Sequence, residues 1–329
     1  MKALAKGFFT IVIAAYIVAL AGAAVFEFHL APRQQKDTIM ILRGENALQI
    51  ANDLKAEGYI KSKVIFIFLV LKEGNLKKLK AGEYDFKGLD YRAIIDKLLK
   101  GQVIVKTATV IPGWTIRDIA ASPQIKEIIP NENFSGAASD ELRGKFDFLD
   151  SLPADDDLEG YLFPDTYQFP KDTDADGLAV LMLENFDKKL IPAFRDKIKV
   201  RGISIHEAVI MASILEKEVI TLEDKKIVAG ILYKRLEVKM PLQVDCTLLY
   251  SKTGELKAFD REIDSLYNTY RYAGLPPGPI CNPGIESIEA AIEPLDSPYW
   301  FYLSAPEGTT YFSKTYDEHL ANKAKYLDK

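Results

Sequence analysis

The chain has 329 residues, and its 47 acidic residues outnumber its 42 lysines and arginines, which gives a net charge of −5 at neutral pH. This acidic balance, with no basic run after the N-terminal segment, argues against a nucleic-acid partner. The three histidines, His29, His206 and His319, form no HExxH or clustered His/Cys pattern, so neither a metal nor a cofactor is expected. The sequence also lacks the P-loop, dinucleotide-binding and serine-hydrolase motifs, which removes those common classes.

The N-terminal segment predicts a membrane anchor. Residues 8–26 carry no charge and are long enough, at about 1.5 Å per residue, to cross a hydrocarbon core of about 30 Å. Lys2 and Lys6 precede the segment, so the positive-inside rule leaves the N-terminus in the cytoplasm. A cleaved signal peptide is the alternative, because the small residues at 19–23 resemble a cleavage site. We expect a cytoplasmic tail at 1–7, a single transmembrane helix at 8–28 and a linker at 29–37, with the rest of the chain on the periplasmic side of the inner membrane.

The next region predicts a small module of strand, helix, helix and strand. The expected elements are strands at 38–42 and 82–86 and helices at 47–57 and 64–71, followed by a helix at 91–99 that ends at Gly101. Residues 44–51 and 113–120 form a faint repeat, each a glycine turn followed by a helix ending in Ile-Ala. This opening resembles the LysM module, a βααβ unit that binds N-acetylglucosamine polymers. A packing module without glycan affinity is an equal alternative. We assign 38–150 to this LysM-like module and a connecting region.

The second half of the chain, 151–329, predicts a larger domain in which helices and short strands are segregated, so the expected fold class is α+β. The residues at 131–157 are expected to form a loop. Helices are predicted at 175–197, 205–219, 223–237 and near 287–291, strands at 300–304 and 310–312, and a closing helix from about Thr315. Cys246 and Cys281 are compatible with a disulfide or with two buried thiols.

Two glutamates end a long apolar run in this domain. Ser204 and Glu207 read as a capping box, and nearly every residue of 208–215 is apolar, which predicts a helix buried all round. Glu216 follows directly, and such surroundings favour a protonated carboxyl of the kind that a general acid needs. Glu218 has a similar neighbourhood, so periodicity does not separate the two. The ordinary alternative is a glutamate at the edge of a core helix, paired with a lysine or an arginine.

Six motifs follow one another in the second half of the chain: 159–167, 212–218, 243–245, 267–270, 274–280 and 282–284. Together with the N-terminal span, they resemble the endolytic murein transglycosylase (YceG-like) family. The resemblance implies a membrane-anchored enzyme that cuts nascent peptidoglycan strands internally, near the cell-wall synthases. It also implies that the first glutamate of the Glu-Lys-Glu triplet, Glu216, is the catalytic one.

The implied reaction needs only one carboxyl group. Glu216 would protonate the oxygen between N-acetylmuramic acid and N-acetylglucosamine, and would then take the proton of the muramic 6-hydroxyl, which closes a 1,6-anhydro ring. Two alternatives stay open: a hydrolase with Glu159 or Asp165 as a second carboxyl, and a glycan-binding scaffold without activity. The residues expected to bind substrate are Gln243, Asp245, Asn268, Tyr267 and Glu218. Loop capping is the alternative role for Gln243, Asp245 and Asn268, and core packing for Tyr267.

Overall fold

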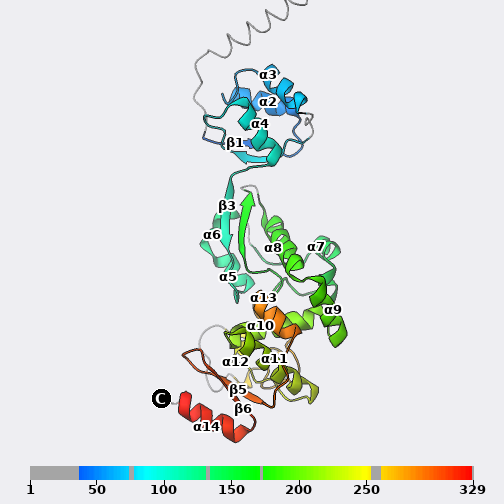
Figure 1. The fold of residues 1–329 in the computed structure, drawn as a ribbon, viewed down its shortest axis with the longest axis vertical. Helices are drawn as coiled ribbons and strands as arrows, with labels where there is room; N and C mark the ends of the chain where they lie inside the picture. The colour runs from blue at the N-terminus through cyan, green and yellow to red at the C-terminus, as the bar shows by residue number, and fades with distance from the viewer. Residues whose placement is uncertain (1–36, 74–77, 131–133, 171–172, 253–260, 328–329) are drawn as a thin grey trace, which may run out of the picture. The chain divides into compact units, whose positions relative to one another are not determined.

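The computed structural model describes residues 37–73, 78–130, 134–170, 173–252 and 261–327 (Figure 1). The described residues form two compact units, those within Met1–Lys106 and Phe169–Asp172 and those within Thr107–Gln168 and Thr173–Lys329. The predicted tail, transmembrane helix and almost all of the linker lie outside the described residues. Among the helices of the described ranges, none is long and apolar enough to cross a bilayer. The division into functional domains at 38–150 and 151–329 stays a prediction.

The first unit has the βααβ order that the sequence predicts. Its elements in chain order are β1 (Ile39–Ile41), α2 (Ala47–Ala56), α3 (Lys63–Lys72), β2 (Gly82–Tyr84) and α4 (Tyr91–Lys100). The two strands pair antiparallel, with Ile39 opposite Tyr84. Asn46 caps α2 by accepting hydrogen bonds from two backbone amides, and α4 ends at Gly101, where φ is 70°. The identity of this unit as a LysM module stays a prediction.

One hydrophobic core holds the first unit together. Residues from both strands and all three helices contribute to it, and Leu54, Phe66 and Tyr84 are fully buried. The rings of Tyr84 and Phe86 stack at a centroid distance of 5.0 Å. Burial of these large side chains supplies the main stabilisation of a unit of this size.

The second unit is a mixed α+β domain, which confirms the predicted fold class. Strands β3 (Val105–Thr109) and β4 (Thr166–Pro170) lie mostly in this unit, and each has two residues in the first unit. The other elements before the central helices are α5 (Ile116–Ala121), α6 (Pro123–Ile128), α7 (Asp140–Lys145), η1 (Asp147–Ser151), α8 (Ala175–Lys189) and α9 (Pro192–Arg201). Those that follow are α10 (Ile205–Glu218), α11 (Leu222–Glu237), α12 (Asp245–Ser251), α13 (Ile285–Ile292), β5 (Phe301–Ser304), β6 (Thr310–Ser313) and α14 (Tyr316–Tyr326).

Two predictions about this unit are wrong. The helix expected at 175–197 is two helices, because Pro192 cannot donate a backbone hydrogen bond within a helix and instead begins α9 at its first position. The stretch 131–157, expected as a loop, contains α7 and η1 in its described part. Ser139 begins α7 by accepting a hydrogen bond from the amide of Leu142.

Helix α10 forms the centre of the second unit. Its capping box is present as predicted, with Ser204 and Glu207 each accepting from the other's backbone amide. The helix is buried from Ala208 to Leu215 and packs against α11, α12 and α13 (Figure 1). The buried hydroxyl of Ser213 donates to the Ile210 carbonyl and accepts from the Ile280 amide. This bond fixes the loop before α13 onto the helix.

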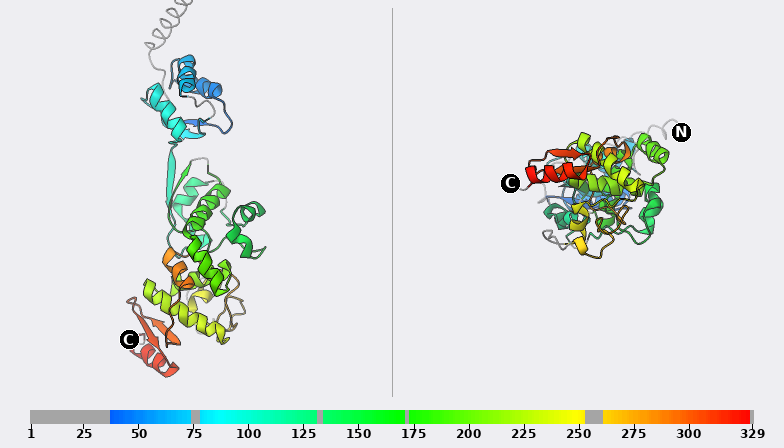
Figure 2. Two further views of the ribbon diagram at one scale, coloured as in Figure 1. Left: turned by 45° about the vertical axis from the view of Figure 1, so that its right-hand side comes forward. Right: turned by 90° about the horizontal axis from the view of Figure 1, so that it is seen from below.

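The C-terminal elements form a small layer of their own. Strands β5 and β6 pair antiparallel, with Phe301 opposite Ser313 and Ser304 opposite Thr310. Helix α14 packs against both strands, and Figure 2 shows the three elements side by side. Both strands and the closing helix agree with the sequence prediction.

Candidate functional site

A pocket of about 400 Å³ lies in the second unit, and we call it the Glu218 pocket. It is formed by the end of α10, the start of α12, part of α11, strand β5 and one face of α14. Its lining residues are Glu218, Arg235, Gln243, Asp245, Arg261, Tyr270, Phe301, Tyr302, Leu303, Ser304, Tyr316, His319, Lys323 and Leu327. The pocket therefore brings together three of the residues that the sequence singled out, Glu218, Gln243 and Asp245.

Glu218 is a half-buried carboxyl that lines this pocket. The hydroxyl of Tyr302 donates to its Oε2 over 3.1 Å. Cys246 donates to the same carboxyl group from its backbone amide and its thiol. Burial raises the pKa of Glu218 above its ordinary value, and the hydrogen bonds from Cys246 and Tyr302 oppose that rise without cancelling it. Glu218 therefore has the raised proton affinity that a general acid needs.

Gln243 and Asp245 lie on the rim of the pocket with exposed side chains. Gln243 has a φ of 55°, which is uncommon for a residue with a side chain. Its backbone amide donates to the Thr269 carbonyl over 3.0 Å. Asp245 accepts a hydrogen bond of 2.6 Å from the Tyr270 hydroxyl, and the guanidinium of Arg261 lies 4.0 Å from it. Both polar side chains are available to a ligand in the pocket.

Glu216 lies elsewhere, between the end of α10, helix α11 and the start of α13. Its Oε2 accepts from the Gly284 amide over 2.9 Å and from the Ser287 hydroxyl over 2.6 Å. The ammonium of Lys225 lies 3.7 Å from the same oxygen, and the side chains of Glu216 and Lys225 are only 13% and 6% exposed. Distant segments thus surround this carboxylate with donors, contrary to the apolar setting expected from the helix pattern. The arrangement is a buried ion pair.

Two further predicted residues lie away from the Glu218 pocket. Asn268 is fully buried, and its side-chain amide donates to the carbonyls of Arg261 and Ile263 over 2.8 Å each. This is the loop-capping role named above as the alternative to substrate binding. Both N–H groups of the side chain are used, so neither can donate to a sugar. Tyr267 lines a separate pocket of about 150 Å³ together with Glu159 and Tyr250.

The two carboxyls considered for a hydrolase also have other surroundings. Glu159 is buried and accepts from the Ile116 amide over 3.1 Å and from the Asn282 side-chain amide over 2.9 Å. Burial raises the pKa of Glu159 to about 8. Hydrogen bonds from the Asn185 side chain and the Thr166 amide lower the pKa of Asp165. Neither carboxyl lines the Glu218 pocket.

The cysteines are both buried and free in the structure. The Cys281 thiol donates to the Ser213 carbonyl over 3.4 Å, and the Cys246 thiol donates to Glu218. The disulfide that the sequence left open is therefore not formed in this structure.

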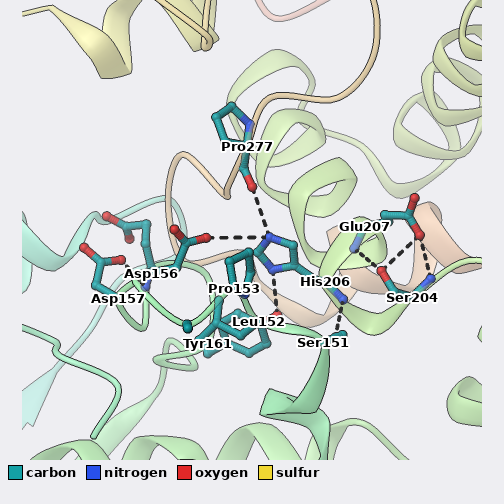
Figure 3. A network of polar contacts seen from close by, with 12 residues as sticks. Ser151, Leu152, Pro153, Asp156, Asp157, Tyr161, Ser204, His206, Glu207 and Pro277 are labelled. Carbon is teal, nitrogen blue, oxygen red and sulfur yellow. Dashed lines mark hydrogen bonds and ion pairs between the residues drawn. The ribbon is translucent and has the colours of Figure 1, made fainter.

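A network around His206, a residue that the sequence did not single out, fixes the proline-rich loop at 274–280 (Figure 3). Its Nδ1 lies 3.0 Å from the Tyr161 hydroxyl and its Nε2 lies 3.1 Å from the Pro277 carbonyl. The Asp156 carboxylate is 4.0 Å from Nε2. A histidine in the first turn of a buried helix was the available signal. The network ties the loop that leads to Asn282 and Gly284 to the start of α10.

Comparison with known proteins agrees with this architecture. The model of the YceG-like family matches residues 39–325, and the chain belongs to that family. This confirms the resemblance inferred from the six motifs. A Bacillus subtilis protein named endolytic murein transglycosylase is 34% identical over 330 residues, which cover 94% of this chain and 91% of the relative.

Two other relatives extend the comparison. A Streptococcus pneumoniae protein of the same name is 32% identical over 88% of this chain, but the match spans only 58% of that longer relative. The crystal structure of a YceG-like protein from Listeria monocytogenes matches with a TM-score of 0.59 and 31% identity, covering 88% of this chain and 99% of that one.

Proposed function

We propose that this protein is an endolytic transglycosylase that cleaves the bond between N-acetylmuramic acid and N-acetylglucosamine within peptidoglycan strands. The names of the relatives support this reaction, and the Bacillus protein matches over nearly its whole length. The observation that carries the proposal is the Glu218 pocket, in which a carboxyl with a raised pKa lies beside exposed polar side chains. Such a group is suited to general acid catalysis.

The geometry favours Glu218 over Glu216 as the acid. The carboxyl of Glu218 lines an open pocket and has an increased proton affinity, so it retains a proton at higher pH than an ordinary glutamate. Oε2 of Glu216, in contrast, already receives two hydrogen bonds and faces the Lys225 ammonium, and Glu216 does not line the Glu218 pocket. The assignment of the acid to Glu216, implied by the family resemblance, remains the competing prediction.

The proposed mechanism uses Glu218 twice. In its protonated form it donates to the glycosidic oxygen, and the bond to the muramic C1 breaks. As a carboxylate it then accepts the proton of the muramic 6-hydroxyl, whose oxygen attacks C1 and closes the 1,6-anhydro ring. The hydrogen bonds from Tyr302 and Cys246 stabilise the carboxylate between the two steps. Gln243 and Asp245 bind the hydroxyl and acetamido groups of the sugar.

A two-carboxylate hydrolase is the second candidate, because Asp245 lines the same pocket as Glu218. In that reaction Asp245 would act as the nucleophile or would activate a water. The products separate the two reactions, since hydrolysis leaves a reducing muramic end whereas transglycosylation leaves an anhydro end.

The location of the reaction is also a proposal. The apolar residues 8–28 would anchor the chain in the inner membrane, with the remainder in the periplasm beside nascent strands and the synthases that make them. A protease added to the outside of spheroplasts should then digest the part after residue 37 and spare the first seven residues.

The test is mass spectrometry of the glycan products formed from uncrosslinked peptidoglycan by the full chain and by Glu218→Gln and Glu216→Gln. Internal fragments ending in 1,6-anhydromuramic acid are expected from the unsubstituted protein and from Glu216→Gln. If these fragments are absent with Glu218→Gln, the result supports Glu218 as the general acid. Full activity of Glu218→Gln with none for Glu216→Gln would return the acid to Glu216, and reducing ends throughout would favour the hydrolase.

A further inference from the structure

Helix α14 contributes two basic side chains to the Glu218 pocket. His319 and Lys323 are four residues apart on this helix and therefore lie on the same face, and both line the pocket. The ring of His319 stacks on Phe301 at a centroid distance of 5.5 Å, which fixes its orientation. The C-terminal layer thus forms a basic part of a pocket whose other part contains the carboxyls of Glu218 and Asp245.

Both side chains on α14 have unused hydrogen-bonding capacity. Nδ1 of His319 is buried and makes no hydrogen bond to any described residue. Lys323 is half-buried and, within the described ranges, forms no ion pair. Burial and the nearby charges of Lys323 and Arg235 lower the pKa of His319, which disfavours its charged form. A neutral imidazole still carries a proton on one ring nitrogen. A buried polar atom without a partner is costly unless a ligand satisfies it.

The other two basic side chains that line the pocket, Arg235 and Arg261, are already engaged. The guanidinium of Arg235 donates to the carbonyls of Trp300 and Leu242. Arg261 lies over the ring of Tyr270 at 4.5 Å and faces Asp245 at 4.0 Å. This leaves the pair on α14 as the donors available to an anionic ligand.

A peptidoglycan strand offers one kind of anion near the bond that is cut. Each muramic residue carries a lactyl group, which ends in a carboxylate when the strand is bare and in a peptide with carboxylates when it is substituted. We propose that His319 and Lys323 form a subsite for a carboxylate of this lactyl-peptide branch, bound by the Lys323 ammonium and by Nδ1–H of His319. This inference rests on the proposed function and adds the part of the substrate that α14 recognises.

The subsite gives the C-terminal layer a role in choosing the register of the strand. Only muramic residues carry the branch, so a carboxylate held by α14 places a muramic unit, and not N-acetylglucosamine, beside Glu218. His319 and Lys323 thus act as positioning residues that make the strand bind with the correct bond at the acid.

The test compares Lys323→Gln with Lys325→Gln in the full chain. Lys325 is exposed on the same helix, bonds to the Tyr326 side chain and does not line the pocket, so its substitution removes the same charge elsewhere. The substrates are peptide-bearing strands, bare strands, and the same two preparations with their carboxylates converted to amides.

Lys323→Gln is expected to raise KM about tenfold on carboxylate-bearing strands, with kcat unchanged, because a charge-assisted hydrogen bond is lost. The unsubstituted protein should show the same raised KM on amidated strands, where Lys323→Gln has no further effect. An effect confined to peptide-bearing strands would assign the carboxylate to the peptide, and one confined to bare strands would assign it to the lactyl group. Lys325→Gln should match the unsubstituted protein throughout.

Two results would overturn the subsite: an unchanged KM for Lys323→Gln on every strand, or an equal increase on amidated strands. The His319→Asn variant adds a second check, since it keeps a donor near the position of Nδ1 and should retain more affinity than His319→Leu. If the unsubstituted protein cuts no strand at all, the proposed function fails. The subsite is then tested by binding: the dissociation constant of carboxylate-bearing strands should be about tenfold higher for Lys323→Gln than for the unsubstituted protein.

Discussion

The Ser287 hydroxyl donates a hydrogen bond of 2.6 Å to Oε2 of Glu216, which joins the start of α13 to the end of α10. The Gly284 amide and the Lys225 ammonium converge on the same oxygen. A Cβ added to Gly284 would lie 3.4 Å from Pro112 and 3.5 Å from Oε2 of Glu216, which is ordinary van der Waals contact. These contacts connect α10, α11 and α13, and from them we predict a structural role for Glu216.

We therefore predict that Glu216→Ala lowers the free energy of unfolding by about 3 kcal/mol, because it leaves the buried Lys225 ammonium without its partner. The double variant Glu216→Ala with Lys225→Met should recover part of this loss. Urea denaturation measures both. The Lys226–Glu289 pair, with side chains 18% and 31% exposed, is the matched control, and Lys226→Met should cost less than about 1 kcal/mol. Equal losses at the two pairs would contradict the structural role.

The second prediction concerns the pH dependence of activity. Glu218 must be protonated to donate, so kcat/KM should fall as the pH rises through its raised pKa. The Tyr302 hydroxyl stabilises the carboxylate, so Tyr302→Phe should raise that pKa further and move the falling limb to higher pH. The pH profile of strand cleavage checks the shift. Tyr299→Phe, outside the pocket lining, should leave the limb in place. A shift to lower pH for Tyr302→Phe would exclude Glu218 as the titrating acid.

The third prediction concerns the pH dependence of stability. The pKa of Glu159 rises from 4.5 to about 8 on folding. Between these values the folded state holds a proton that the unfolded state has released, so the free energy of unfolding decreases as the pH rises through this window. Glu159→Gln should flatten this part of the profile. Asp165→Asn serves as a control, because the pKa of Asp165 is lowered instead. If the free energy of unfolding of Glu159→Gln still falls with pH as steeply as that of the unsubstituted protein, the raised pKa of Glu159 is not its cause.

The fourth prediction tests the packing of α11. A Cβ on Gly230 would lie 2.0 Å from the Leu295 carbonyl oxygen, a backbone atom that cannot move away cheaply. Gly230→Ala should therefore destabilise the protein by about 2 to 3 kcal/mol. Gly144 in α7 has open space around the same position, so Gly144→Ala should stabilise by up to about 1 kcal/mol. Thermal unfolding of the two variants compares them directly, and similar melting temperatures would contradict the close approach.

Much of the architecture follows from local patterns. The capping box at Ser204 and Glu207 and the apolar run after it predicted the start, length and burial of α10, because these features act within a few turns of one chain segment. The βααβ order and the C-terminal strands were predicted for the same reason. The break at Pro192 is also a local signal, because a proline lacks the amide that would continue α8 and instead begins α9.

The roles of the two glutamates depended on tertiary structure. Glu216 and Glu218 have similar neighbours along the helix, and periodicity could not separate them. Their surroundings come from distant segments: Lys225, Gly284 and Ser287 around Glu216, and Cys246, Tyr302 and the pocket around Glu218. The same applies to Asn268, whose carbonyl partners are set by the path of its loop.

The sequence by itself determined the family, the order of the elements and the helix that carries the two carboxyls, because each of these depends on residue type and local spacing. The tertiary structure decided which carboxyl enters a pocket, which one is neutralised by a lysine, and which basic side chains of α14 join the pocket. The physical reason is that proton affinity and hydrogen-bond partners depend on desolvation and on charges within a few ångströms, and these neighbours are brought together only by folding.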